Sequence, residues 1–450
     1  MPRPSASDPK PADGPAPAPR RPSGAAASAG RGTPGRSLRR FFAALGPGVI
    51  TGAADDDPSG IATYSIAGAQ LGTSLLWTAA LTWPLMAAVQ MMCARIGMVT
   101  GEGLAGALGK KFPRPFLVGA AIALLLANTI NIAADLSAMA DSAEMLSGIN
   151  SHYFVVVFGA GIAVATVRLH YYQIAAILKW LALVLFAYVV TAFLVHPRWS
   201  AVLHDTFIPG GLHGSQAWAT LVAILGTTIS PYLFFWQASQ EVEEEKAKGR
   251  RMLVQRRSAT RAEIVDRKLD VGVGTFFSNA AMFFIILVTA LTLHAHGLTH
   301  IETSRQAAEA LRPLAGDLAY TLYTVGILGV GFLAIPTLAG SAAYAFAETF
   351  RWRHGLNQKL AGARRFYVVI LLSTAAGIAL DFAHVNPIQA LFWTAVINGL
   401  LAPFLMVGIL IVASDRRLMN GQPSSWLGRV AVGAATALMF IAAIGMFVFQ

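Results

Sequence analysis

Charged residues and cysteines are both scarce in this chain. Asp, Glu, Lys and Arg make up 13% of its 450 residues, whereas hydrophobic residues make up 55%. Soluble domains average roughly 25% charged residues, so this composition cannot cover a water-exposed surface and excludes a soluble fold. The single cysteine, Cys93, excludes an intrachain disulfide and a cysteine-based zinc cluster, and we interpret it as a packing residue.

The start of the chain lacks the short hydrophobic core and small-residue cleavage site of a signal peptide. Residues 1–38 are instead rich in Pro, Ala, Gly and Ser, with scattered Arg. A segment of this composition cannot bury a core, so we expect a disordered tail.

Long hydrophobic runs fill the rest of the chain. A helix needs about 20 largely apolar residues to cross a bilayer. Candidate spans lie at 42–70, 75–99, 116–146, 152–167, 172–195, 215–237, 269–293, 318–349, 366–381, 388–413 and 427–449. The sequence therefore predicts an all-α integral membrane protein with about eleven transmembrane helices in a lipid bilayer.

Basic residues are concentrated in the N-terminal tail and in every second connection between the spans. Lys and Arg collect on the cytoplasmic side of membrane proteins. This pattern predicts a cytoplasmic N-terminus, an outside C-terminus and a location in the inner (plasma) membrane. It also explains the net charge of +11 without binding to nucleic acid.

The first span is interrupted by the sequence DDDPSG at 55–60. Three consecutive carboxylates at membrane depth cannot face lipid, since each charge costs at least a few kcal/mol there. Pro58 removes a backbone donor and Gly60 favours non-helical dihedral angles. We therefore predict that this helix unwinds at 57–60.

The sixth span has a similar interruption, GTTISP at 226–231. Matching Gly/Pro interruptions in two halves point to a substrate site at the midplane of an inverted repeat. The predicted division is a first repeat at 39–213, a second at 214–414, and an eleventh helix with the C-terminus at 415–450. Proline kinks without a ligand role are the alternative explanation.

The chemistry of the two interruptions favours a hard cation. Freed carbonyls, hydroxyls and a carboxylate are oxygen ligands that suit Mg²⁺, Mn²⁺ or Ca²⁺. Neither interruption contains Cys, Met or His, the ligands that softer metals prefer. The sequence thus predicts a divalent cation as the transported substrate, with no cofactor.

Several segments resemble the Nramp family of divalent-metal transporters. DPSGIATYSIAGAQLGTSLLW (57–77) is similar to the signature that opens with DPGN in that family, and GTTISPY (226–232) stands where the family has Met-Pro-His. AADLSAM (133–139), TLAGSAAYAFAE (337–348) and the pair Arg364–Arg365 resemble further family segments. The resemblance covers roughly 40–415 and implies the inverted five-plus-five fold of sodium-coupled amino-acid symporters.

Departures from the family pattern bear on the choice of metal. Family members bind transition metals with Asp and Asn on the first helix and Met on the sixth; here Asp57 remains, but Gly60 and Ser230 replace the other two. Loss of the thioether removes the preference for softer metals, and loss of the Asn enlarges the site. The pattern resembles the Nramp-related magnesium transporters, which predicts Mg²⁺ transport with Mn²⁺ also accepted.

Two titratable residues of the proton-coupled relatives are also replaced. The resemblance places Tyr232 at the position of a His and Ala138 at that of a Glu, and neither residue titrates near neutral pH. We therefore expect facilitated uptake without proton coupling, by a monomer. Asp135 is expected to form a structural ion pair with Arg365.

Two sets of residues are assigned to the ion. The proposed metal site contains Asp57, Gly60, Thr227, Thr228 and Ser230, and the proposed pathway contains Asp55, Asp56, Ser59, Tyr232, Thr394 and Asn398. The alternatives are a helix N-cap for the aspartate at 57, backbone hydrogen bonds for the three hydroxyls, and a helix–helix hydrogen bond for Asn398. Helix–helix hydrogen bonds are also the role expected of Asn128, Asn131 and Asn279.

Other functions remain as alternatives. Within the family, the alternative is a proton-coupled Mn²⁺/Fe²⁺ transporter; outside it, a sodium-coupled amino-acid symporter, a membrane-embedded hydrolase or a scaffold. The hydrolase lacks HExxH and GxSxG motifs, and the scaffold lacks a ligand domain. The stretch 241–268 is expected to be a solvated cytoplasmic helix and loop, the alternative being a Mg²⁺ sensor at Glu243–Glu245.

Overall fold

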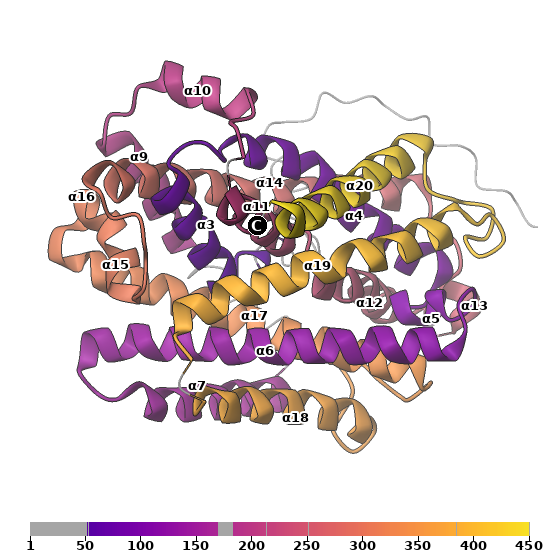
Figure 1. Ribbon diagram of the computed structural model, residues 1–450. Coiled ribbons are helices and arrows are strands. Elements are labelled where there is room, and N and C mark those ends of the chain that lie inside the picture. Colours follow the sequence, from indigo (N-terminus) through magenta and orange to yellow (C-terminus); the bar gives the residue numbers. More distant parts are fainter. Residues whose placement is uncertain are drawn as a thin grey trace, which may run out of the picture. The chain divides into compact units, whose positions relative to one another are not determined.

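A computed structural model describes residue 52 and residues 54–169, 183–212, 214–250, 252–383 and 385–449. Within these ranges all regular secondary structure is helical (Figure 1). Eight helical segments among them are long and apolar enough to cross a membrane. The predicted class, an all-α protein with many membrane spans, is confirmed.

Most predicted spans coincide with a helix. The principal helices are α3 (Pro58–Leu71), α4 (Trp77–Thr100), α6 (Arg114–Ser147), α7 (Ser151–Arg168), α9 (Phe186–Leu194), α11 (Gly214–Thr228), α12 (Pro231–Ala247), α14 (Arg261–Thr292), α17 (Ala319–Thr349), α18 (Arg364–Asp381), α19 (Pro387–Ser414) and α20 (Trp426–Val448). The tail, the beginning of the first predicted span and residues 172–182 of the fifth lie outside the described residues. The total of eleven spans therefore stays a prediction.

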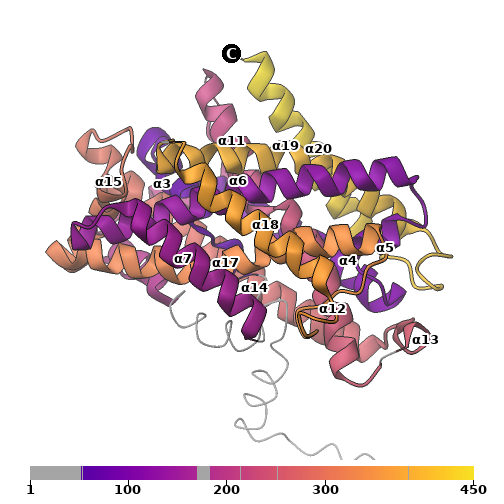
Figure 2. The ribbon, with the colours of Figure 1, turned by 90° about the horizontal axis from the view of Figure 1, so that it is seen from below.

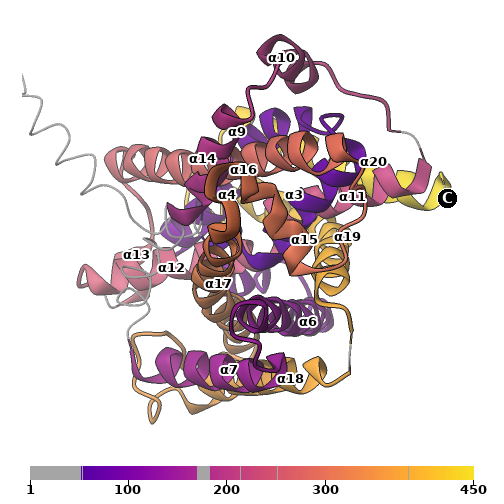
Figure 3. The ribbon, with the colours of Figure 1, turned by 90° about the vertical axis from the view of Figure 1, so that its left-hand side faces the viewer.

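The long helices of the two halves of the chain pack against one another. Helix α3 packs against α14, and α12 packs against α4, so the broken helix of each half contacts the second helix of the other. Helices α6 and α17 lie along one another, and α7 and α18 form a layer beside them (Figures 1 and 3). Seen from below, this layer lies in front (Figure 2).

Two glycines allow α19 to approach the broken sixth helix closely. A Cβ added to Gly226 would lie 2.1 Å from the Ala395 carbonyl oxygen, and one added to Gly399 would lie 2.3 Å from the Val222 carbonyl oxygen. No other residue type has room at such a crossing. The contact places α19 directly against α11.

Both predicted interruptions are present, but each is shorter than expected. The first break lies at Asp56–Asp57, because Pro58 and Gly60 form the first turn of α3 instead of unwound chain. Proline suits a first helical turn, where its missing N–H is not needed. The second break lies at Ile229–Ser230, between α11 and α12.

The expectation of a solvated segment at 241–268 is wrong for its beginning: most of 247–268 is exposed, but most of 241–245 is buried. Glu241, Glu243 and Glu245 are all at most 4% exposed. Arg267 lies among three carboxylates, with its Nε 2.8 Å from Glu241 and its Nη1 2.5 Å from Asp270; the third is Glu244. Amphipathic spacing could not reveal this burial, because it depends on α12 packing against α4 and on the ion pairs between α12 and Arg267 of α14.

The proposed Mg²⁺ sensor at 243–245 is already occupied by cations of the chain itself. Lys246 lies 2.7 Å from Glu243, and Arg250 lies 2.5 Å from Glu245. The Arg250 guanidinium also contacts Glu263, and these carboxylates raise its pKa above the usual value. These carboxylates stabilise the connection between α12 and α14.

Candidate functional site

Asp57 occupies the first break and forms the N-cap of α3. Its Oδ1 accepts the Gly60 backbone N–H at 2.7 Å, and its Oδ2 accepts the side-chain amide of Asn131 at 3.1 Å. The side chain is only 3% exposed. The predicted capping role is therefore present. Each carboxylate oxygen of Asp57 accepts one hydrogen bond and keeps a further lone pair, so capping and cation binding are compatible.

Asn131 joins the first and third helices at this point. The same amide group that contacts Asp57 also donates to Asp135 Oδ2 at 3.2 Å. The Oδ1 atoms of Asn131 and Asp135 are buried and have no hydrogen-bond partner among the described residues. Sequence reasoning assigned Asn131 only to helix packing. Its i, i+4 spacing from Asp135, which puts both on one face of α6, is the signal that could have found it.

The other two acidic residues of the DDD run face α14. Ser278 Oγ lies 2.6 Å from Asp55 Oδ2 and 3.0 Å from Asp56 Oδ1. A serine hydroxyl has one proton, so it can donate to only one carboxylate at a time. The contact with the other carboxylate therefore needs a proton on that carboxylate or a cation between the two oxygens. Asp55 Oδ1 is buried without a described partner.

The hydroxyls of the sixth helix are engaged with the backbone. Ser230 Oγ lies 2.8 Å from the Gly226 carbonyl and 2.6 Å from that of Thr227. Thr228 donates to the Ile224 carbonyl at 2.9 Å. The structure thus shows the backbone hydrogen bonds that were the alternative to metal ligation. A hydroxyl that donates its proton retains lone pairs for a cation, so ligation stays a prediction.

Two tyrosines link the broken helices. Thr227 Oγ1 lies 3.0 Å from the Tyr64 hydroxyl of α3. Tyr232 donates to the Ala54 carbonyl at 2.9 Å, just before the first break. A Cβ added to Gly60 would lie 3.4 Å from Tyr64 Cε2, an ordinary contact distance. The site thus has room for one more methyl group, and Tyr64 is a residue that sequence reasoning missed.

The remaining pathway residues are buried near the breaks. Ser59 lies in the first turn of α3, and Thr394 and Asn398 lie on α19, which packs against α3 and α11. Thr394 donates to the Leu391 carbonyl, and Asn398 Oδ1 is buried without a partner in the described ranges.

Two of the asparagines do form the expected helix–helix hydrogen bonds. Asn128 donates to the Leu338 carbonyl and to the Ser341 hydroxyl, both on α17. Asn279 on α14 accepts from Thr82 on α4.

The predicted ion pair between Asp135 and Arg365 is wrong. Asp135 is fully buried, whereas Arg365 is exposed and its guanidinium lies 5.7 Å from the Trp352 ring centre. Helix α18 meets the Asp135 region at Gly377, whose added Cβ would lie 2.7 Å from Ile132. That position is roughly 18 Å along the helix from Arg365, at 1.5 Å per residue. Helices α6 and α18 therefore cross too far from Arg365 for it to reach Asp135.

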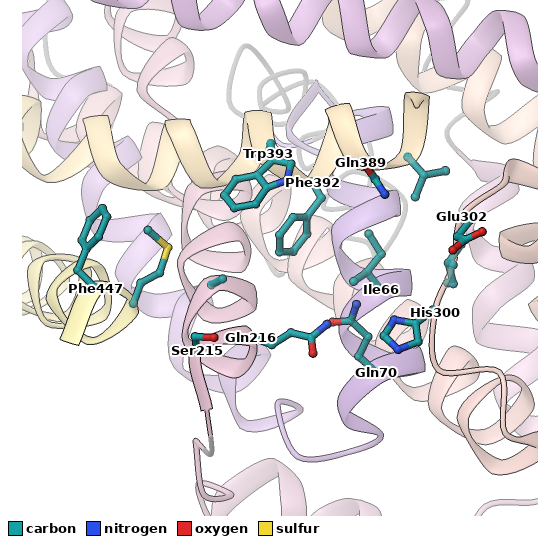
Figure 4. A pocket seen from close by; sticks show the side chains of 14 residues that line it. Ile66, Gln70, Ser215, Gln216, His300, Glu302, Gln389, Phe392, Trp393 and Phe447 are labelled. Atoms are coloured by element: carbon teal, nitrogen blue, oxygen red, sulfur yellow. The ribbon is translucent and has the colours of Figure 1, made fainter. Parts of the chain in front are cut away.

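A cavity of about 780 Å³ lies beside the far ends of the broken helices. Ile66 and Gln70 line it from α3, Ser215 and Gln216 from α11, and Phe392 and Trp393 from α19 (Figure 4). His300 and Glu302 close one side. The Oε1 atom of Gln70 is buried without a described partner. The cavity does not include Asp57 among its lining residues, so the carboxylate is closed off from it.

The described residues include no group of three or more His, Cys, Asp or Glu side chains that could hold a metal ion. Any cation at the first break would therefore have mostly neutral oxygens and water around it. Two helices broken at facing positions, with a buried carboxylate between them, define a class: membrane transporters that bind substrate at helix breaks.

Comparison with known proteins identifies the family. A family model described as "Natural resistance-associated macrophage protein-like" (Nramp) matches residues 48–449. The chain belongs to this family of divalent-metal transporters, so it is a transporter and not an enzyme.

Individual relatives agree with this assignment. The chain is 27% identical over 416 residues to "Divalent metal cation transporter MntH" of Caldanaerobacter subterraneus subsp. tengcongensis, covering 88% of this chain and 90% of the relative. It resembles the crystal structure of an Eremococcus coleocola manganese transporter at a TM-score of 0.71, with 18% identity over 91% of this chain and 87% of the other. The nucleobase-cation symporter Mhp1 shares the fold at a TM-score of 0.56, with 14% identity over 90% of this chain and 92% of the other.

Proposed function

We propose that this protein transports Mg²⁺ by facilitated diffusion, with Mn²⁺ also accepted. The observation that supports this proposal is the oxygen-only composition of the two breaks. The proposed site consists of Asp57, the backbone carbonyls of 54–56 and 226–230, and three hydroxyls. The carbonyls of Ala54, Gly226 and Thr227 each accept a hydroxyl hydrogen bond and keep a second lone pair for a cation. Cys, Met and His are absent from 52–64 and 224–232. Oxygen ligands suit Mg²⁺ and do not select against it in favour of softer metals.

Unpartnered acceptors beside Asp57 support a partly hydrated ion. Mg²⁺ dehydrates reluctantly and usually keeps several waters. The free Oδ1 atoms of Asn131 and Asp135 can accept protons from such waters. The absence of a side chain at Gly60 leaves room beside Asp57 for a group the size of a methyl. In this arrangement Asp57 is the anionic ligand, directly or through water.

The relatives favour a second candidate, proton-coupled transport of Mn²⁺ or Fe²⁺. One solved relative is described as a manganese transporter, and the curated relatives are described as divalent metal cation transporters. Residues of this chain argue against proton coupling. Tyr232 is engaged with the Ala54 carbonyl, and Ala138 lies in an apolar cluster with Ala62 and Leu391. Neither side chain can take up and release a proton near neutral pH.

The membrane potential suffices as the driving force. Moving one charge through 100 mV yields about 2.3 kcal/mol, so a dication gains roughly 4.6 kcal/mol. The 780 Å³ cavity lies at the beginning of α11, which the predicted topology with a cytoplasmic N-terminus assigns to the outer side. We propose this cavity as the entrance and inward transport across the inner membrane as the direction.

Transport in proteoliposomes distinguishes the candidates. Vesicles loaded with a Mg²⁺-sensitive dye, a Mn²⁺-sensitive dye or a pH-sensitive dye are exposed to each metal at fixed membrane potentials. We expect both metals to enter, with rates that follow the potential and without acidification beyond leak. Entry of Mn²⁺ alone, or acidification that tracks the metal, would establish the second candidate instead.

A further inference from the structure

A second cavity, of about 470 Å³, lies between α4, α14 and the start of α20. Helix α4 packs against both α14 and α20, and each of the three belongs to a candidate membrane span. Most of the wall is apolar, including Pro84 and Met91 of α4, Val271 of α14 and Leu427 of α20. The cavity shares no lining residue with the cavity beside the broken helices. We call it the α4/α14/α20 groove.

Two cationic side chains lie at one end of this groove. Arg95 comes from the last turns of α4, and Lys268 from the beginning of the antiparallel helix α14. Arg95 is half-buried and donates from Nε to the Gln422 carbonyl at 3.3 Å, whereas Lys268 is exposed. Among the residues that the structure describes, neither forms an ion pair with a carboxylate. The groove therefore carries positive charge that the described protein does not neutralise.

A buried hydroxyl lies at the same end. Ser424 lines the groove, is only 5% exposed, and its Oγ has no hydrogen-bond partner in the described part of the chain. A buried hydroxyl without a partner costs free energy, so an acceptor is missing. An oxyanion between the two cations supplies one.

We propose that the groove binds an anionic phospholipid. The headgroup phosphate would lie between Arg95 and Lys268 and accept a hydrogen bond from Ser424, while an acyl chain would lie along the apolar wall. Basic pockets between transmembrane helices on the cytoplasmic side bind such headgroups. The cations lie at the ends of α4 and α14 that adjoin the basic connection 246–268, which places them in one leaflet.

Charge and shape together select this occupant. A zwitterionic lipid would bring its own cation toward Arg95 and Lys268. A free phosphate ion would leave the apolar wall uncovered. Only an anionic amphiphile matches both parts of the groove. The proposal is independent of the metal that the protein carries.

Lipid-dependent stability of the full-length protein tests the proposal. Delipidated protein in a neutral detergent is titrated with phosphatidylglycerol, phosphatidylcholine or glycerol 3-phosphate, and its unfolding temperature is followed. We expect a rise with phosphatidylglycerol alone. The double substitution Arg95→Gln/Lys268→Gln is expected to lower the affinity for phosphatidylglycerol, read from this titration, about tenfold or more. The reason is that each basic residue contributes to the attraction. Arg364→Gln, an exposed cation on α18, is the matched control.

A second variant changes the wall without changing any charge. Gly272 lines the groove, and a Cβ added to it meets no heavy atom within 4 Å. Gly272→Leu should therefore fold and occupy the space of the acyl chain, which weakens the phosphatidylglycerol response. Gly119→Leu, at an equally open position on α6, should leave it unchanged.

Three results would overturn the proposal: equal responses to the two lipids, an undiminished response in both groove variants, or a response to glycerol 3-phosphate as large as to phosphatidylglycerol. The last result would mean a simple anion site.

Discussion

The substitution Asp57→Asn separates the charge of the proposed ligand from its structural role. Asparagine is as good an N-cap as aspartate, so its oxygen can keep the hydrogen bond from Gly60. Its amide would face Asn131, whose unpartnered Oδ1 can turn to accept it. The fold should therefore survive, and the change should act on the cation.

The expected loss of affinity is large. Two unit charges 4 Å apart attract by about 4 kcal/mol at an effective dielectric constant of about 20, so a carboxylate and a dication attract by roughly 8 kcal/mol. The asparagine oxygen and extra water recover part of this. We take about half as the net loss, roughly 4 kcal/mol, which is about a thousandfold weaker binding.

Calorimetric titration with Mg²⁺ and Mn²⁺, together with flux into proteoliposomes, measures this effect. The matched control is Asp135→Asn, which removes a second buried carboxylate held by the same Asn131 amide. We expect a smaller loss in the control, because Asp135 lies outside both helix breaks. If Asp57→Asn binds and transports within threefold of the unsubstituted protein, the assignment of Asp57 as the anionic ligand is refuted.

Three further substitutions test the site and its supports. Ser230→Met should raise the ratio of Mn²⁺ to Mg²⁺ flux, since a thioether prefers the softer ion; an unchanged ratio would contradict the ligand-softness argument. Gly226→Ala should destabilise the protein by about 1–3 kcal/mol, because its methyl group would collide with the Ala395 carbonyl; Gly119→Ala, at an open position, is the control in thermal unfolding. Arg267→Ala should cost about 3–5 kcal/mol by leaving buried carboxylates without their cation; a melting temperature equal to that of the parent would show that the cluster is dispensable.

The sequence alone determined the membrane class and the positions of the two helix breaks. Low charge and long apolar runs are properties of composition, and they do not depend on how helices pack. The run DDDPSG and the matched Pro231 identified both broken helices for the same reason, because a carboxylate or a proline at membrane depth has few structural solutions. Asp57 was found in this way, and so was the oxygen-only character of the breaks.

Tertiary structure decided which side chains meet. Asn131 joins the site only because α6 passes the first break, and Arg365 is excluded because α18 crosses α6 far from it. The buried position of Arg267 among its carboxylates depends on how α12 and α14 meet. Helical periodicity specifies the face on which a residue lies, whereas the crossing points of helices, set here by contacts such as those of Gly226 and Gly377, specify its partner.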